Sequence, residues 1–146
     1  MRRVALAIGL AALLAGPTAI GAPMEKGVVP EAAPLATSRP PDPANGRRIV
    51  VDRRRGLCLL CHAGPFPEER FHGDLAPSLA GTGSRWTEGQ IRARLIDSTA
   101  INPDTIMPPY FKSEGGNRIG RAFAGKPILT AEEIEDVTAF LTTLRE

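Results

Sequence analysis

Residues 58–62 of this chain read Cys58-Leu59-Leu60-Cys61-His62, and no other segment carries as specific a chemical signal. Two thiols three residues apart, followed directly by a histidine, are typical of a c-type haem attachment site. The spacing has a chemical reason, because each thiol can add to one vinyl group of the porphyrin. The histidine then lies under the iron as its proximal ligand. The segment therefore predicts one covalent haem c, attached through Cys58 and Cys61, with His62 on the iron.

Cys58 and Cys61 are the only cysteines among the 146 residues. A disulfide-dense secreted scaffold and a zinc site built of cysteine alone each need at least four thiols, so both are excluded. A mixed zinc site would have to recruit His62 and His72 as well. A thioredoxin-like pair needs a βαβ context, whereas a helix and a glycine-rich loop flank this motif. A plain disulfide leaves His62 unexplained, so haem attachment remains the favoured interpretation.

Met107 and His72 are the candidates for the second axial ligand of the iron. Met107 is the only methionine beyond residue 43. Pro108 disfavours a helical backbone at Met107, so an extended loop can present the sulfur to the iron. Ligation by His62 and Met107 raises the reduction potential, which suits an electron carrier. His72 follows His62 by ten residues and would have to swing around the haem edge to ligate the iron, so we interpret it as a surface loop residue.

Four further residues are predicted to support the haem. The backbone carbonyl of Pro77 is the candidate acceptor for the second ring N–H of His62, and Leu79 is expected to pack on the haem. Arg85 and Trp86 carry donors that can meet the haem propionates, although ordinary surface packing would explain them equally well. No catalytic residue is assigned.

The first 22 residues have the order of a secretory signal peptide. Arg2 and Arg3 precede an apolar run over 4–15, and small residues follow near residue 22. The run is shorter than the roughly 20 residues that span a bilayer, so we expect cleavage, a periplasmic protein and no membrane anchor. Without the two arginines the chain carries 16 basic and 16 acidic residues, which argues against nucleic-acid binding.

Residues 23–43 contain six prolines and no apolar periodicity, so they predict an extended or disordered arm. Two interpretations stay open: a solvated tail, or a strap that orders on a partner surface. The cytochrome domain is then 44–146. Seven aromatic residues are few for a chain of this size, which suggests that a cofactor fills part of the core.

Helix signals begin directly after the arm. Asp42 followed by Pro43 is typical of an N-cap and a first helical position, and predicts a helix to about Arg53 that Gly56 ends. Gly46 costs stability inside a helix, which favours a close crossing by another helix there.

Two capping boxes predict two further helices. Thr87 and Gln90 introduce a helix that stops near Asp97. Thr130 and Glu133 introduce the terminal helix, whose apolar stripe comprises Ile134, Val137, Leu141 and Leu144. Its acids, which are Glu132, Glu133, Glu135 and Asp136, are explained as solvated residues at the positive end of the helix dipole. No strand pattern separates the helices, so we expect a small all-α fold whose long loops, 63–86 and 98–129, wrap a ligand.

Four segments, 58–67, 76–85, 101–108 and 125–131, resemble in this order the SoxX family, the monohaem subunits of SoxAX cytochrome complexes. The resemblance covers about residues 44–146. It implies a class I cytochrome c-like fold of three or more helices, in which the first and last helices cross between Gly46 and residues 137–141. It also implies His62 and Met107 as the axial ligands.

The resemblance further implies a periplasmic heterodimer with a SoxA-type cytochrome subunit. Such a complex couples thiosulfate oxidatively to a cysteine of the carrier SoxYZ and releases two electrons. The sulfur chemistry belongs to the haem of SoxA, and this chain has no spare cysteine for it. Its expected role is that of a non-catalytic subunit that accepts the electrons and passes them to a soluble cytochrome c. A free-standing diffusible cytochrome is the alternative, and a haem-based gas sensor is disfavoured by Met107.

Overall fold

The computed structural model describes residues 29–113, 121 and 123–146. The elements in chain order are α1 (Pro43–Val51), the 3-10 turn η1 (Cys58–Leu60), α2 (Thr82–Arg85), α3 (Glu88–Ile96), α4 (Ser98–Ile101) and α5 (Ala131–Thr143). This part of the chain contains no strand, and none of its helices has the length and apolar composition that a membrane crossing requires. The expected signal peptide and residues 23–28 of the arm lie outside the described residues.

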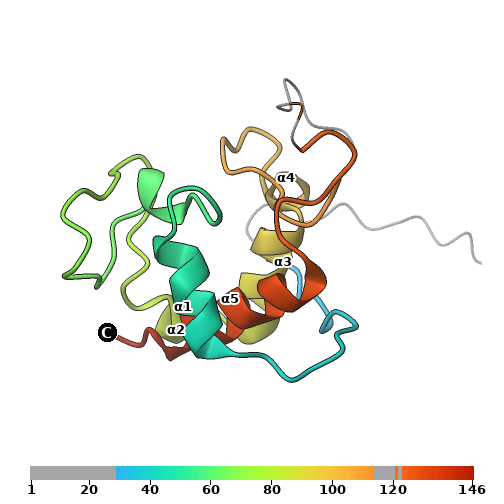
Figure 1. Cartoon of the computed structure of the whole chain (residues 1–146), viewed down its shortest axis with the longest axis horizontal. Coiled ribbons are helices and arrows are strands. Elements are labelled where there is room, and N and C mark those ends of the chain that lie inside the picture. Colours follow the sequence, from blue (N-terminus) through green and yellow to red (C-terminus); the bar gives the residue numbers. More distant parts are fainter. Residues whose placement is uncertain (1–28, 114–120, 122) are drawn as a thin grey trace, which may run out of the picture.

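Helices α1 and α5 cross at the centre of the molecule, and α3 and α2 pack against the same terminal helix (Figure 1). At the crossing, Gly46 lies against the backbone of Asp136. A Cβ atom on Gly46 would overlap the carbonyl oxygen of Asp136 and lie 2.9 Å from the Cβ of Phe140. The expected close helix crossing at Gly46 is therefore confirmed.

Both predicted capping boxes are present. The Thr87 side chain accepts from the N–H of Gln90 and opens α3, while Thr130 and Glu133 make the same reciprocal pair at the start of α5. Along α5, Ile134, Val137 and Leu141 are buried. These side chains join the core with residues from α1, η1 and α3, which are Ile49, Val50, Leu59, Ile91 and Leu95.

Helix α1 begins at Pro43 with Asp42 as its N-cap, as predicted, and it ends at Val51, two residues before Arg53. The reason is the Asp52 side chain, which accepts from the N–H groups of Arg54 and Arg55 at 2.7 and 3.2 Å and turns the chain out of the helix. Gly56 lies beyond this turn and does not end the helix. The single-turn helices α2 and α4 carried no periodic signal in the sequence.

Residues 29–42 form neither helix nor strand, and they lie against α3 and α5 before leading into α1. Val29 is buried. The N–H of Ala32 donates to the carbonyl of Gly89 at 3.1 Å, and the N–H of Leu35 donates to the Glu135 carboxylate at 2.9 Å. This segment is therefore held by its own chain.

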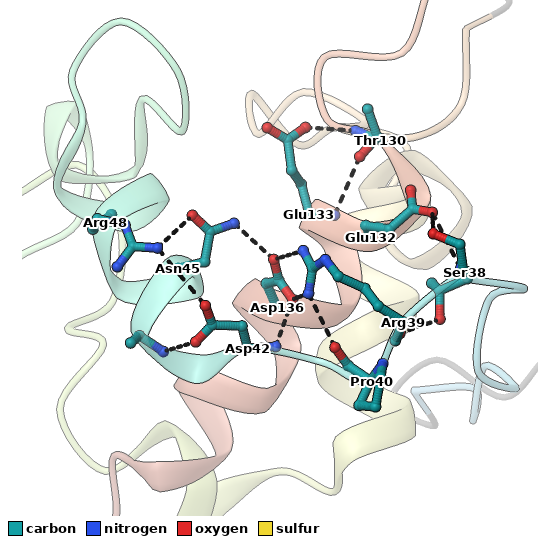
Figure 2. A network of polar contacts seen from close by, with 12 residues as sticks. Ser38, Arg39, Pro40, Asp42, Asn45, Arg48, Thr130, Glu132, Glu133 and Asp136 are labelled. Atoms are coloured by element: carbon teal, nitrogen blue, oxygen red, sulfur yellow. Dashed lines mark hydrogen bonds and ion pairs between the residues drawn. The ribbon is translucent and has the colours of Figure 1, made fainter.

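The solvated interpretation of the α5 acids is wrong for Asp136, which has no exposed surface. Figure 2 shows its carboxylate surrounded by donors from the arm and from α1. Arg39 donates to it at 2.8 Å, the backbone N–H of Asp42 at 2.6 Å and the Asn45 side-chain amide at 2.7 Å. Asp136 therefore joins three segments of the chain at the α1–α5 crossing.

The solvated interpretation is also wrong for Glu135, which is buried against α3. Arg92, which is 2 % exposed, donates to both Glu135 oxygens, with Nε and Nη2 each 2.8 Å from the oxygen they face. Arg92 also donates to the carbonyl of Ala32 at 3.0 Å. This buried pair fastens α3, the arm and α5 to one another.

Candidate haem site

The attachment segment forms a tight turn. Leu57 has a left-handed backbone, with φ of 61°, and the N–H groups of Cys61 and His62 both donate to the carbonyl of Cys58. Within the turn, Leu59 is buried in the core. Cys58, Cys61 and His62 instead line a cavity on the other side. Burial in the core thus fixes which way the three reactive side chains face.

His62 is oriented by the chain that runs beside it. The N–H groups of Gly73, Ala76 and Leu79 donate to carbonyls of residues 59, 61 and 63, at 2.9, 3.0 and 2.8 Å. This pairing places the carbonyl oxygen of Pro77 2.6 Å from Nδ1 of His62. A carbonyl can only accept, so Nδ1 carries the proton, and Nε2 is the nitrogen left for a metal.

Met107 lies in the loop after α4, where it is half-buried and lines the same cavity. Two hydrogen bonds hold the Met107 backbone, one at its carbonyl and one at its N–H. The hydroxyl of Ser98 donates to the carbonyl of Met107 at 2.6 Å, and the N–H of Met107 donates to the hydroxyl of Thr105 at 3.1 Å. Because Ser98 is itself buried at the start of α4, its hydrogen bond holds the Met107 loop against that helix.

The cavity has a volume of about 720 Å3, within the range of small-molecule and cofactor sites. All eight residues predicted for the haem site line it, namely Cys58, Cys61, His62, Pro77, Leu79, Arg85, Trp86 and Met107. Most of the remaining lining is aliphatic, and no Asp or Glu among the described residues contributes to it.

Arg85 faces the cavity but already has partners in the loop that follows Pro77. Its guanidinium donates to the carbonyls of Ser78 and Ala80 at 2.8 and 2.6 Å. These contacts hold residues 78–80 in place, which in turn positions the Pro77 carbonyl. Arg85 therefore fixes the loop at the rim of the cavity.

Sequence reasoning missed Arg94. Its guanidinium stacks on the Trp86 ring, 3.7 Å from the ring centroid, and donates to the carbonyl of Gln90. Burial lowers the pKa of the Arg94 guanidinium. Arg94 follows Ile91 by three residues, so a cation on the apolar face of the predicted helix was the available signal.

Tyr110 was also missed. It is buried, lines the cavity and donates its hydroxyl to the carbonyl of Gly56 at 2.6 Å. No local pattern indicates a partner 54 residues away. Burial raises the pKa of the Tyr110 hydroxyl, and it raises the pKa of the Cys58 thiol to about 11. Both cysteines are free thiols and no disulfide joins them.

His72 lies in a loop, as expected, and is half-buried. Its Nδ1 accepts from the N–H of Gly64 at 3.3 Å, and its ring meets the edge of Phe66 with the centroids 6.1 Å apart. Its Nε2 atom is buried. His72 does not line the cavity, so it is not placed as a ligand of this site.

These residues fit a haem. The aliphatic lining suits the porphyrin face, and the two thiols, the imidazole with a fixed tautomer and the thioether are the donor set of a c-type cytochrome. The only acidic groups a haem presents are its propionates, and the described residues give the cavity two guanidinium groups and no carboxylate. The donor set and the charge of the lining therefore agree on the same cofactor.

The fold is all-α and class I cytochrome c-like. Neither a scan against protein-family models nor a search of curated proteins returns a match. Among solved structures, the chain is similar to the crystal structure of SoxXA from P. pantotrophus. The identity is 42% and the TM-score 0.68, and the match covers 75% of this chain and 86% of that chain. The chain belongs to the SoxX family of cytochromes.

Proposed function

We propose that this chain is a periplasmic monohaem cytochrome c and the electron-transfer subunit of a SoxAX-type complex. One observation carries the proposal: Cys58, Cys61, His62 and Met107 line a single apolar cavity in a chain that is 42% identical to a SoxXA structure. In this proposal, residues 1–22 direct export as a signal peptide.

Each residue has a definite task in this proposal. Cys58 and Cys61 hold the haem as thioethers, and His62, oriented by Pro77, ligates the iron through Nε2. Met107 supplies its sulfur as the other axial ligand, and Leu79 packs on the porphyrin. When bound, the haem supplies one-electron exchange at its iron.

Two donor groups of the lining are assigned to the propionates, those of Arg85 and Trp86. Arg94 extends this set, because its cation lies on the Trp86 ring and faces the cavity. Charge-assisted hydrogen bonds to carboxylates are stronger than neutral ones, so this side of the cavity would orient the haem.

The sulfur chemistry is assigned to a partner. Both thiols of this chain are used in holding the haem, so none remains to bind a sulfur substrate. In the proposed complex, a SoxA-type subunit couples thiosulfate to a cysteine of the carrier SoxYZ, which releases two electrons. This chain accepts those electrons one at a time from the partner haem and passes them to a soluble cytochrome c.

The match to a SoxXA structure supports a docked subunit over a diffusing carrier.

Co-expression with a SoxA-type subunit tests the assignment to a complex. We expect the two chains to co-elute as a heterodimer at micromolar concentration, with thiosulfate-dependent reduction of this chain's haem. If this chain elutes as a monomer under those conditions, it is a free-standing carrier.

The assignment of Met107 is tested separately by Met107→Ala in the holoprotein. We expect this variant to lose the iron–sulfur charge-transfer absorption of the oxidised protein and to show a lower reduction potential. An unchanged absorption band would remove Met107 from the iron.

A further inference from the structure

Tyr110 is anchored at three points, each on a different part of the chain. Its N–H donates to the carbonyl of Leu95 at the end of α3, and its carbonyl accepts from the N–H of Leu129, both at 2.9 Å. Its hydroxyl donates to the carbonyl of Gly56 at 2.6 Å. The side chain is 4 % exposed, so the hydroxyl has little access to water.

The Gly56 end of this contact belongs to the attachment segment. Gly56 precedes Leu57, the one residue other than glycine with a positive φ in the described part of the chain. Such a backbone persists only where its surroundings hold it. The Cys58 sulfur lies 3.3 Å from the same Gly56 carbonyl, but a thioether cannot donate a hydrogen bond. In the proposed holoprotein the Tyr110 hydroxyl would remain as a donor to that carbonyl.

The other end of the contact belongs to the Met107 loop. Only Pro108 and Pro109 separate Met107 from Tyr110, and proline fixes φ near −65°. A movement of Tyr110 is therefore transmitted to Met107 with little loss. The Met107 carbonyl, which belongs to the peptide bond with Pro108, also accepts from the Ser98 hydroxyl at 2.6 Å.

We propose that Tyr110 is a positioning residue that ties the Met107 loop to the attachment segment. The two segments supply the two ends of the haem site, so the Tyr110–Gly56 hydrogen bond sets how far apart they can move. It keeps the Met107 sulfur on the iron and keeps small external ligands off it. This inference rests on the proposed ligation by Met107.

The test uses the holoprotein with Tyr110→Phe, which keeps the ring and removes only the hydroxyl. Imidazole is titrated into the oxidised form, because it binds iron only when the sulfur has left. Apparent affinity rises with the open fraction, so we expect at least about ten-fold tighter imidazole binding than in the parent. The iron–sulfur charge-transfer absorption should weaken.

Thr142→Val is the matched control. It also removes one hydroxyl-to-carbonyl hydrogen bond, from Thr142 to Thr138 at 2.8 Å in α5, away from the cavity. Unfolding by denaturant is measured for both variants. A merely structural role for Tyr110 predicts that both lose stability and neither changes imidazole affinity. We expect imidazole affinity to change in Tyr110→Phe alone.

Amide hydrogen exchange at Leu57 and Met107 is followed on the same samples, and it can be measured whether or not Met107 ligates the iron. We expect faster exchange at both sites in Tyr110→Phe and no change in Thr142→Val. If the parent lacks the charge-transfer band, Met107 is not a ligand of the iron. The exchange rates alone then show whether Tyr110 links the Met107 loop to the attachment segment. The proposal is overturned if Tyr110→Phe and the parent exchange at the same rate at both sites. It is also overturned if the parent has the charge-transfer band and Tyr110→Phe binds imidazole no more tightly, or if Tyr110→Phe takes up no haem.

Discussion

The buried carboxylate of Asp136 stabilises the contact between the arm, α1 and α5. Desolvation by burial raises the pKa of Asp136, but the hydrogen bonds from Arg39, the Asp42 N–H and Asn45 outweigh it, so the pKa lies below its ordinary 3.8. A carboxyl whose folded pKa is depressed stabilises the native state above its unfolded pKa. That contribution is lost as the pH falls through the folded value.

Asp136→Asn should therefore change both the size and the pH dependence of stability. An amide offers one acceptor oxygen and turns two donors toward groups that also donate, so we expect a loss of about 2–3 kcal/mol at neutral pH. The parent should lose stability steeply below about pH 4, and the variant less steeply. Urea unfolding at pH 7 and pH 3 measures both. Equal slopes in the two proteins would refute the role given to Asp136.

At the scale of elements, the helix contacts depend on one close approach and one buried ion pair. Gly46 lets α1 lie against the backbone of α5, while Arg92 and Glu135 join α3 to α5. The capping boxes at Thr87 and Thr130 were predictable because both partners lie within four residues. The partners of Glu135 and Asp136 were not, because Arg92 and Arg39 are 43 and 97 residues away in the sequence.

Gly46→Ala should force α1 and α5 apart. Its Cβ would overlap the Asp136 carbonyl, so the gain in helix propensity is outweighed by overpacking, and we expect a loss of about 2–3 kcal/mol. Gly89→Ala in α3 is the matched control, because its nearest neighbour is the movable end of the Glu31 side chain. Thermal unfolding should show a clear drop for Gly46→Ala and little change for Gly89→Ala; similar melting temperatures would argue against the crossing.

Arg92→Ala should leave the Glu135 carboxylate buried without its cation. Breaking a buried pair from one side costs about 3–5 kcal/mol, whereas replacing both partners by apolar groups is often neutral. We therefore expect the double variant Arg92→Met, Glu135→Leu to be clearly more stable than Arg92→Ala in denaturant unfolding. If the double variant is the less stable of the two, the pair does not act as described.

In the molecule as a whole, the loops and helices surround the cavity that the segment 58–62 faces. The attachment segment faces a cavity that is lined by all eight residues predicted for the haem site. These residues were predictable because the motif indicates a haem, and the loop residues were selected for the ligand, acceptor and donor groups that a haem needs. Arg94 and Tyr110 were missed for a different reason. Each acts through tertiary contacts, a stacked ring and a carbonyl 54 residues away, that no spacing in the sequence encodes.

The intact mass of the exported, denatured protein shows whether a single haem is held covalently by Cys58 and Cys61. We predict the mass of the chain without its first 21 or 22 residues plus that of one haem. Replacing both cysteines with serine should give the polypeptide mass alone and a chain that does not fold, because the haem supplies part of the core. A parent protein whose denatured mass equals that of the bare polypeptide would show that no haem is attached covalently.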